Sequence, residues 1–215
     1  MAADVSPILD ALRALLAPRT DVALVTADER GALLAAFAAA SRRVGKAPLV
    51  LADADRARVR SAGIDWPLAT RVDELWRIAQ LVDAASRPDV DALVRDCFRG
   101  GDTDERCAVL RALPLLASPE RFMALAADAC RTSVRTIFEA IACENPFPAR
   151  YLETLHFDQM VLKALFLEVS LARIIGLDGR RTPELTRMAR DYLAERRAAG
   201  RAVSDDLTRL AGERS

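Results

Sequence analysis

The sequence predicts an all-α protein, either an irregular helical bundle or a short α-solenoid built from HEAT-like helix pairs. Three observations favour this class. Apolar residues recur at the 3.6-residue helical period through most of the chain, no segment alternates apolar and polar residues as a half-buried strand would, and no Asn-Gly hairpin turn occurs. We expect one all-α domain over residues 1–215.

The first half of the chain predicts four helices. Ser6-Pro7 is typical of a helix start, with Ser6 as N-cap and Pro7 in the first turn of a helix over 7–17. An Ala-rich helix is expected over 23–44, and Asp53 begins a shorter one that ends near Ser61. The clearest apolar stripe, over 72–85, consists of Val72, Leu75, Trp76, Ala79 and Val82.

A weak internal repeat supports the solenoid alternative. Asp73-Glu74 recurs 31 residues later as Asp104-Glu105, and Arg87-Pro88-Asp89 recurs as Ser118-Pro119-Glu120. Asp102 and Glu105 have the spacing of a capping box. Helix pairs of about 30–45 residues are typical of solenoids, because one pair cannot bury its own apolar face.

The last third of the chain predicts helices over 133–143, 156–167 and 183–199, and a short terminal helix capped by Ser204. Between the first two lies Asn145-Pro146-Phe147-Pro148. Because proline lacks a backbone donor and restricts the residue before it, this segment is expected to be a stiff, extended connector.

Composition excludes several classes of function. The 31 basic and 31 acidic residues balance, which argues against nucleic-acid binding. No C-x-x-C pair occurs among the four cysteines, so we expect reduced core thiols in a cytoplasmic protein, with no metal site and no cofactor. The N-terminus lacks the basic region of a secretory signal, and no apolar run is long enough to cross a membrane. Two of the basic residues are lysines, and we attribute the arginine excess to GC-rich coding.

The candidate site lies on the predicted helix over 156–167. This helix is apolar nearly all round, which indicates burial, except for a polar stripe formed by His156, Gln159 and Lys163. A buried lysine is costly unless it is paired or deprotonated, so a carboxylate is expected nearby. The candidates for that carboxylate are Glu139, Glu144 and Asp158.

We expect the proline segment to fold Glu144 and Asn145 toward this stripe. The predicted ligand-binding set is Glu139, Glu144, Asn145, His156, Gln159 and Lys163. Three roles for Lys163 stay open at this point. Its head reaches solvent along an apolar stem, or it forms a structural bridge to a glutamate, or it serves a ligand or a reaction.

Several segments resemble the EboA family of bacterial proteins. They are ENPFPARY, FDQMVLKALF, RIIGLDGRRTPELTRMARDYLAERRAAGR, DERCAVLRALPLLASPE and RTSVRTIFEAIA, which together span about 102–201. The family pattern Asn-Pro-aromatic-Pro-Ala is matched at 145–149. A second pattern is matched from Gln159 to Ala164 and departs at Asp158, where the family has Asn. The first hundred residues resemble the family only in their helical character.

The resemblance implies a part in making or exporting a secondary metabolite, beside other proteins of that pathway, including a membrane-bound prenyltransferase. One hypothesis is a non-enzymatic protein that binds an intermediate or scaffolds pathway enzymes. It fits the absence of G-x-G-x-x-G, phosphate-loop and nucleophile-elbow motifs. The alternative is an enzyme that uses Lys163 with Glu144 and His156 for acid–base or Schiff-base chemistry on a sugar- or cyclitol-like substrate.

A charged segment over 180–201 carries seven arginines against three acids. The first interpretation is a solvated helix face with pairs such as Arg187–Asp191. The second is docking to anionic lipid or to the membrane-bound prenyltransferase, which would place the protein peripherally at the inner membrane.

Overall fold

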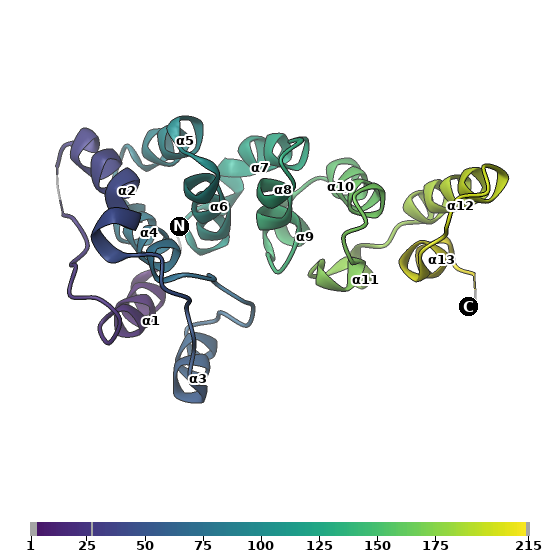
Figure 1. Cartoon of the computed structure of the whole chain (residues 1–215). Helices are drawn as coiled ribbons and strands as arrows, with labels where there is room; N and C mark the ends of the chain where they lie inside the picture. Colours follow the sequence, from purple (N-terminus) through teal and green to yellow (C-terminus); the bar gives the residue numbers. More distant parts are fainter. Residues whose placement is uncertain (1–3, 27, 214–215) are drawn as a thin grey trace.

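The computed structural model describes residues 4–26 and 28–213, and it is helical throughout, as the sequence predicts (Figure 1). No strand occurs in the described part of the chain, where Pro48 and Arg71 form one isolated bridge. The helices of the first half are α1 (Ser6–Leu16), α2 (Arg30–Val44), α3 (Asp53–Ser61), α4 (Val72–Asp83), α5 (Val90–Gly100) and α6 (Thr103–Ala112).

The second half continues in shorter pieces. Its α-helices are α7 (Met123–Cys130), α8 (Arg135–Ala142), α9 (Phe147–Tyr151), α10 (Thr154–Phe166), α11 (Leu177–Arg180), α12 (Pro183–Ala198) and α13 (Asp205–Ala211). Four short 3-10 helices lie between or beside the α-helices: η1 (Ala84–Ser86), η2 (Leu113–Leu115), η3 (Pro119–Phe122) and η4 (Leu171–Arg173).

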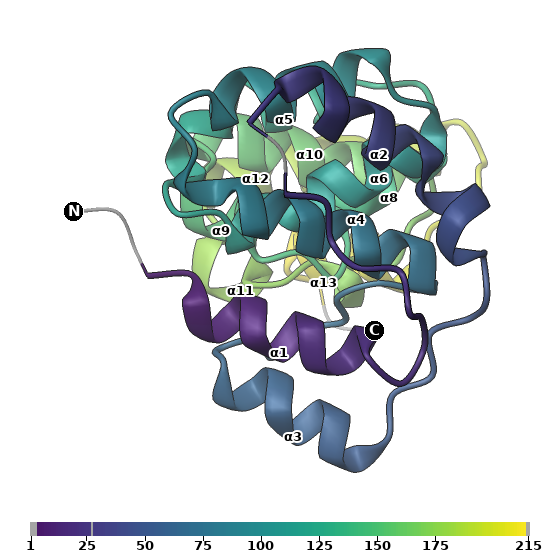
Figure 2. The same cartoon turned by 90° about the vertical axis from the view of Figure 1, so that its left-hand side faces the viewer.

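The helices stack in a row that follows the chain. Helices α4, α6 and α8 pack one against the next, and α2, α5 and α7 cover them on one side (Figure 1). Helices α1 and α3 pack together below this stack (Figure 2). Helix α10 contacts α8 and α12, and α12 packs with α13 as a terminal helical hairpin. The polar residues of α10 are therefore positioned between the main stack and this hairpin.

Two predicted helix caps, at Asp102 and Ser204, are confirmed, and Thr182 forms a third. The Asp102 carboxylate accepts a hydrogen bond from the backbone N–H of Glu105, and the Glu105 side chain accepts one from the N–H of Asp102. The hydroxyl of Thr182 caps α12, and that of Ser204 caps α13. At the first helix the prediction is one position off, because Ser6 is the first helical residue and its side chain does not cap.

The predicted helix over 23–44 is wrong in its first part, because α2 begins only at Arg30. The preceding segment instead binds α4 through side chains. The Gln80 amide accepts from the backbone N–H of Val25 at 2.8 Å and donates to its carbonyl at 2.9 Å. The Trp76 indole N–H donates to the carbonyl of Val22. These bonds satisfy backbone groups of a partly buried segment that would otherwise form hydrogen bonds within a helix.

Helix α4 is buried on all sides rather than along one stripe. Its charges are compensated inside the protein. Asp73, fully buried, accepts from Arg77 at 2.8 Å and from Arg71 at 2.9 Å. Arg71 also reaches Asp104 at 2.8 Å, and Arg77 donates to the carbonyl of Phe37. The recurring acidic pairs thus lie in the first turns of α4 and α6, where Asp73 shares Arg71 with Asp104 and Arg77 with Glu105.

The expectation of an extended connector at the two prolines is wrong. The break does end α8 at Ala142, but the residues from Phe147 to Tyr151 form the short helix α9. The reason lies in the first turn. Proline has a helical φ and is tolerated at a helix start, and the Asn145 side chain accepts from the backbone N–H of Phe147 at 2.9 Å.

Candidate functional site

Three of the six predicted site residues line one cavity. His156, Gln159 and Lys163 project from α10 toward the C-terminal end of α7, beside a cavity of about 360 Å³. Its remaining lining residues are Ala127, Cys130, Arg131 and Met160. The opposite face of α10 is anchored in the core by Phe157, Val161 and Ala164, so the stripe is held in a fixed orientation.

Lys163 pairs with no carboxylate of residues 4–26 and 28–213, and the prediction of such a partner is wrong. Its ammonium donates to the carbonyls of Cys130 at 2.7 Å and Thr132 at 2.5 Å. It also lies 5.0 Å from the centroid of the Phe138 ring. The last carbonyls of a helix have no intrahelical partner and carry partial negative charge, so Lys163 caps the end of α7. Burial lowers the pKa of Lys163 from its ordinary value, whereas the carbonyls and the ring favour the charged form.

Glu139 and Glu144 lie elsewhere, bound to Arg173. The guanidinium contacts both oxygens of Glu144, at 2.7 and 3.0 Å, and one oxygen of Glu139 at 2.6 Å. The Glu144 backbone N–H also donates to the Arg173 carbonyl. The hydrogen bond from Arg173 lowers the pKa of Glu139 despite its partial burial. A bidentate arginine is a stronger partner than a distant lysine, which explains why Glu144 does not turn toward α10.

Asn145 has a structural role. It is buried, and its amide donates to the carbonyls of Leu110 and Ala140, both at 3.0 Å, while its oxygen accepts from Phe147. No group of Asn145 is left for a ligand. Asp158, the third carboxylate candidate, is buried against α12 and accepts from the Thr182 hydroxyl at 2.9 Å.

The cavity holds polar groups that have no partner within the described residues. Neither His156 nor Gln159 makes a side-chain hydrogen bond or an ion pair there, and Lys163 keeps one N–H beyond the two carbonyl bonds. Arg131 at the rim is paired with Asp128. Burial raises the pKa of the Cys130 thiol to about 12, so it is no nucleophile at neutral pH. The arrangement suits the binding of a small polar molecule. Within 4–26 and 28–213, no three His, Cys, Asp or Glu residues are placed to hold a metal ion.

Comparison with known proteins identifies the family. A family model described as "Metabolite traffic protein EboA" matches residues 15–212. The chain belongs to the EboA family. The resemblance seen in the sequence is thereby confirmed, and the EboA match also covers the N-terminal helices from α2 onward. No curated protein and no solved structure matches the chain.

Three further features of this EboA protein concern its charged helix, its relation to a membrane and a second cavity. Arg187 pairs with Glu184 and Asp191, as expected for a solvated helix face. No helix within 4–26 and 28–213 is long and apolar enough to cross a membrane. Sequence reasoning missed a second cavity, of about 350 Å³, between α10, α12 and α13. Its residues come from three separate segments, so no local pattern could have grouped them.

Proposed function

We propose that this EboA-family protein is an accessory protein of a secondary-metabolite pathway that binds a small polar intermediate without reacting with it. The family description, metabolite traffic, supports a role in carrying a small molecule. The observation that carries the proposal is the convergence of His156, Gln159 and Lys163 on one cavity. Polar groups at a pocket wall that lack protein partners are available to orient a ligand.

The chemistry of the cavity favours a ligand with an anionic or hydroxyl-rich group. Lys163 and His156 present donors, Gln159 presents a donor and an acceptor, and Met160 and Ala127 provide apolar contact. The enzymatic alternative has less support. Glu144 is bound to Arg173 and away from the cavity, and the Lys163 amine would have to weaken its two carbonyl bonds to form a Schiff base.

The wider role is part of the same proposal. The four cysteines are unbridged and buried, which supports a reducing compartment, the cytoplasm. The exposed face of α10 and the stacked rows of helices, which we interpret as HEAT-like, offer surfaces for other proteins of the pathway, including a membrane-bound prenyltransferase.

Purification from a producing strain tests the binding function. We expect the native protein to release a small molecule on denaturation, detected by mass spectrometry. Gln159→Trp places a bulky ring at the cavity mouth on an exposed position and should abolish that release. Leu155→Trp is the matched control, since Leu155 is exposed on the same helix but does not line the cavity.

The two variants also separate binding from pathway function. In the producing strain, Gln159→Trp should lower metabolite output while Leu155→Trp leaves it unchanged. Equal small-molecule content in the wild type and Gln159→Trp would remove the Lys163 cavity as the binding site. Undiminished output from Gln159→Trp would contradict the proposed role.

A further inference from the structure

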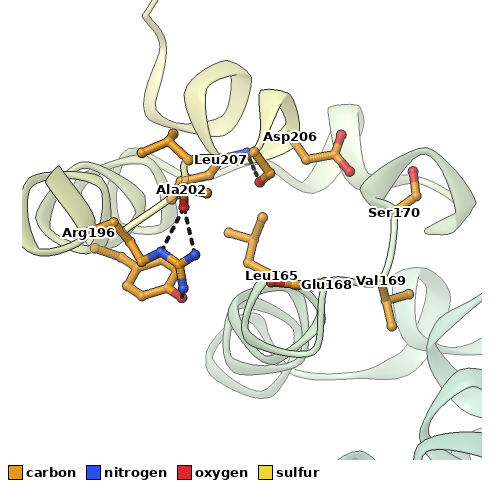
Figure 3. A pocket seen from close by; sticks show the side chains of 11 residues that line it. Leu165, Glu168, Val169, Ser170, Arg196, Ala202, Asp206 and Leu207 are labelled. Carbon is orange, nitrogen blue, oxygen red and sulfur yellow. Dashed lines mark hydrogen bonds between the residues drawn. The ribbon is translucent and has the colours of Figure 1, made fainter. Parts of the chain in front are cut away.

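The second cavity lies where the terminal helical hairpin meets the end of α10 (Figure 3). Its apolar floor consists of Leu165, Val169 and Leu207, all buried. Tyr192 of α12 forms a wall, and its ring is fixed by an edge-to-face contact with Phe166 at 4.5 Å between centroids. A floor and wall of this kind accept an apolar ring or chain.

Opposite walls of this cavity carry opposite charge. The α12 wall carries Arg196, whereas Glu168 and Ser170 follow the end of α10, and Asp206 belongs to α13 (Figure 3). Asp206 is committed to the protein, because it accepts from the Leu171 backbone N–H at 2.7 Å and from Arg209. Arg196 and Glu168 are therefore the charged side chains of this cavity whose charge is available to a ligand.

Arg196 is fixed in place but its charge is not compensated. Its guanidinium donates twice to the Ala202 carbonyl, at 3.0 and 2.6 Å, and once to the Tyr192 hydroxyl at 3.4 Å. All of these acceptors are neutral, and in the described part of the chain no carboxylate lies within 4.0 Å of Arg196. A half-buried, oriented guanidinium of this kind favours an anionic group.

Glu168 ends α10 in a backbone conformation that is unfavourable for a residue with a side chain. Its φ is +54°, in the left-handed region that favours glycine. The local bonds form a complete Schellman motif, from the Val169 N–H to the Ala164 carbonyl and from the Glu168 N–H to the Leu165 carbonyl. Glycine is the usual residue at this position, because a Cβ is strained there.

Glu144 gives the internal comparison. It also has a positive φ, of +48°, after the end of α8, but its carboxylate is held by Arg173 through two hydrogen bonds. The Glu168 carboxylate has no hydrogen bond or ion pair among the described residues. A strained residue whose side chain has no partner, at the edge of a cavity, points to a function for that side chain.

We propose that this cavity is a second binding site, for a small molecule with an apolar ring or chain, an anionic group and a hydrogen-bond donor. The anionic group contacts Arg196, the apolar body lies on Leu165 and Leu207, and an amine or hydroxyl group contacts Glu168. The site is separate from the Lys163 cavity and does not depend on the ligand proposed there.

A matched series of small probes tests the ligand class. The probe 4-(aminomethyl)benzoate carries a carboxylate and an ammonium across one aromatic ring, and benzoate and benzylamine each lack one of these groups. Ligand-observed NMR titration at low salt measures the dissociation constants. We expect the bifunctional probe to bind about fivefold to tenfold more tightly than either single-charge probe, since charged hydrogen bonds at a partly exposed site are moderately strong. Equal affinities for all three probes would overturn the proposal.

Variants assign the probe to this cavity. Arg196→Met should remove the advantage of the carboxylate, and Ala202→Trp, which fills the cavity, should abolish binding. Ala194→Trp, on an exposed position of α12 outside the cavity, should bind as the wild type does. Gln159→Trp should also bind normally, so the outcome is independent of the Lys163 cavity. Full binding by Ala202→Trp would refute the assignment.

Glu168→Gly separates a ligand-binding role from a structural one. Relief of the left-handed strain should raise the melting midpoint by about 2–4 °C in a chain of this length. The same change should reduce the affinity for 4-(aminomethyl)benzoate to that of benzoate, and Glu168→Gln should do so without the gain in stability. A lower midpoint for Glu168→Gly would mean that the carboxylate supports the fold, which contradicts the proposal.

Discussion

Replacing Lys163 by methionine should destabilise the protein even though no ion pair is lost. The lysine donates to two carbonyls at the end of α7 and lies over the Phe138 ring. A hydrogen bond from a charged donor contributes about 1.5–3 kcal/mol, and the half-buried position favours the lower value for each of the two. The ring contact adds about 0.5 kcal/mol. Methionine keeps the apolar stem, and water regains access to the carbonyls, which offsets about 1 kcal/mol. The free energy of unfolding should fall by about 2–3 kcal/mol.

Urea unfolding followed by circular dichroism measures this change. The midpoint of thermal unfolding should fall by about 5–10 °C, given about 2–4 °C per kcal/mol in a chain of this size. Lys46→Met is the matched control, because Lys46 is the other lysine of the chain and pairs with Asp104 at the exposed surface. It should change stability by less than about 1 kcal/mol. Equal stability of Lys163→Met and the wild type would refute the capping role.

Three further outcomes follow from the structure. Arg173 lowers the pKa of Glu139 below its ordinary 4.5. The ionised carboxylate therefore stabilises the fold above that pH, and this stabilisation is lost as the pH falls. The unfolding free energy of Arg173→Gln should depend less on pH between about 5 and 3 than that of the wild type. Burial raises the pKa of every cysteine thiol to about 11 or 12, so a disulfide reagent at about pH 8 should modify none of them before unfolding and all of them afterwards: Cys97, Cys107, Cys130 and Cys143. Borohydride with an aldehyde or keto sugar should leave Lys163 unmodified, and a stable adduct in the mass spectrum would instead support the enzymatic alternative.

Helices with strong local signals were predicted correctly from the sequence. Asp53, Thr182 and Ser204 stand at or just before helix starts, and the capping box at Asp102 formed as expected. The error before α2 occurs where a distant side chain satisfies the backbone. Gln80 holds the segment before α2 out of a helix from 55 residues away in the sequence, and no local rule contains that contact.

Only the part of the candidate site that depends on local spacing was predicted from the sequence. Helical spacing places His156, Gln159 and Lys163 on one stripe of α10, and the structure shows that stripe beside a cavity. The partner of Lys163 depends on how α7 ends and on where Arg173 lies, both of which are tertiary features. The role that we propose for Glu168 could not be inferred from the sequence, because it rests on a backbone angle and on a cavity formed by three segments.

The arginine excess has a structural use that composition alone does not reveal. A stack of short helices has many helix ends, and each end leaves carbonyls without an intrahelical partner. In this protein long basic side chains from neighbouring segments reach those carbonyls, and the favourable sign of the helix dipole strengthens each contact. Lys163 does so at the end of α7, and arginines do so at the ends of α1, α5, α9, α10 and α13: Arg19, Arg106, Arg180, Arg135, Arg181 and Arg190. A guanidinium offers five donors, so one arginine can satisfy carbonyls of two residues, as Arg180 does with Ala149 and Leu152. Arg196 likewise donates to a carbonyl, that of Ala202, but it does so at the wall of an apolar cavity, where the positive charge that holds the chain can also attract a ligand.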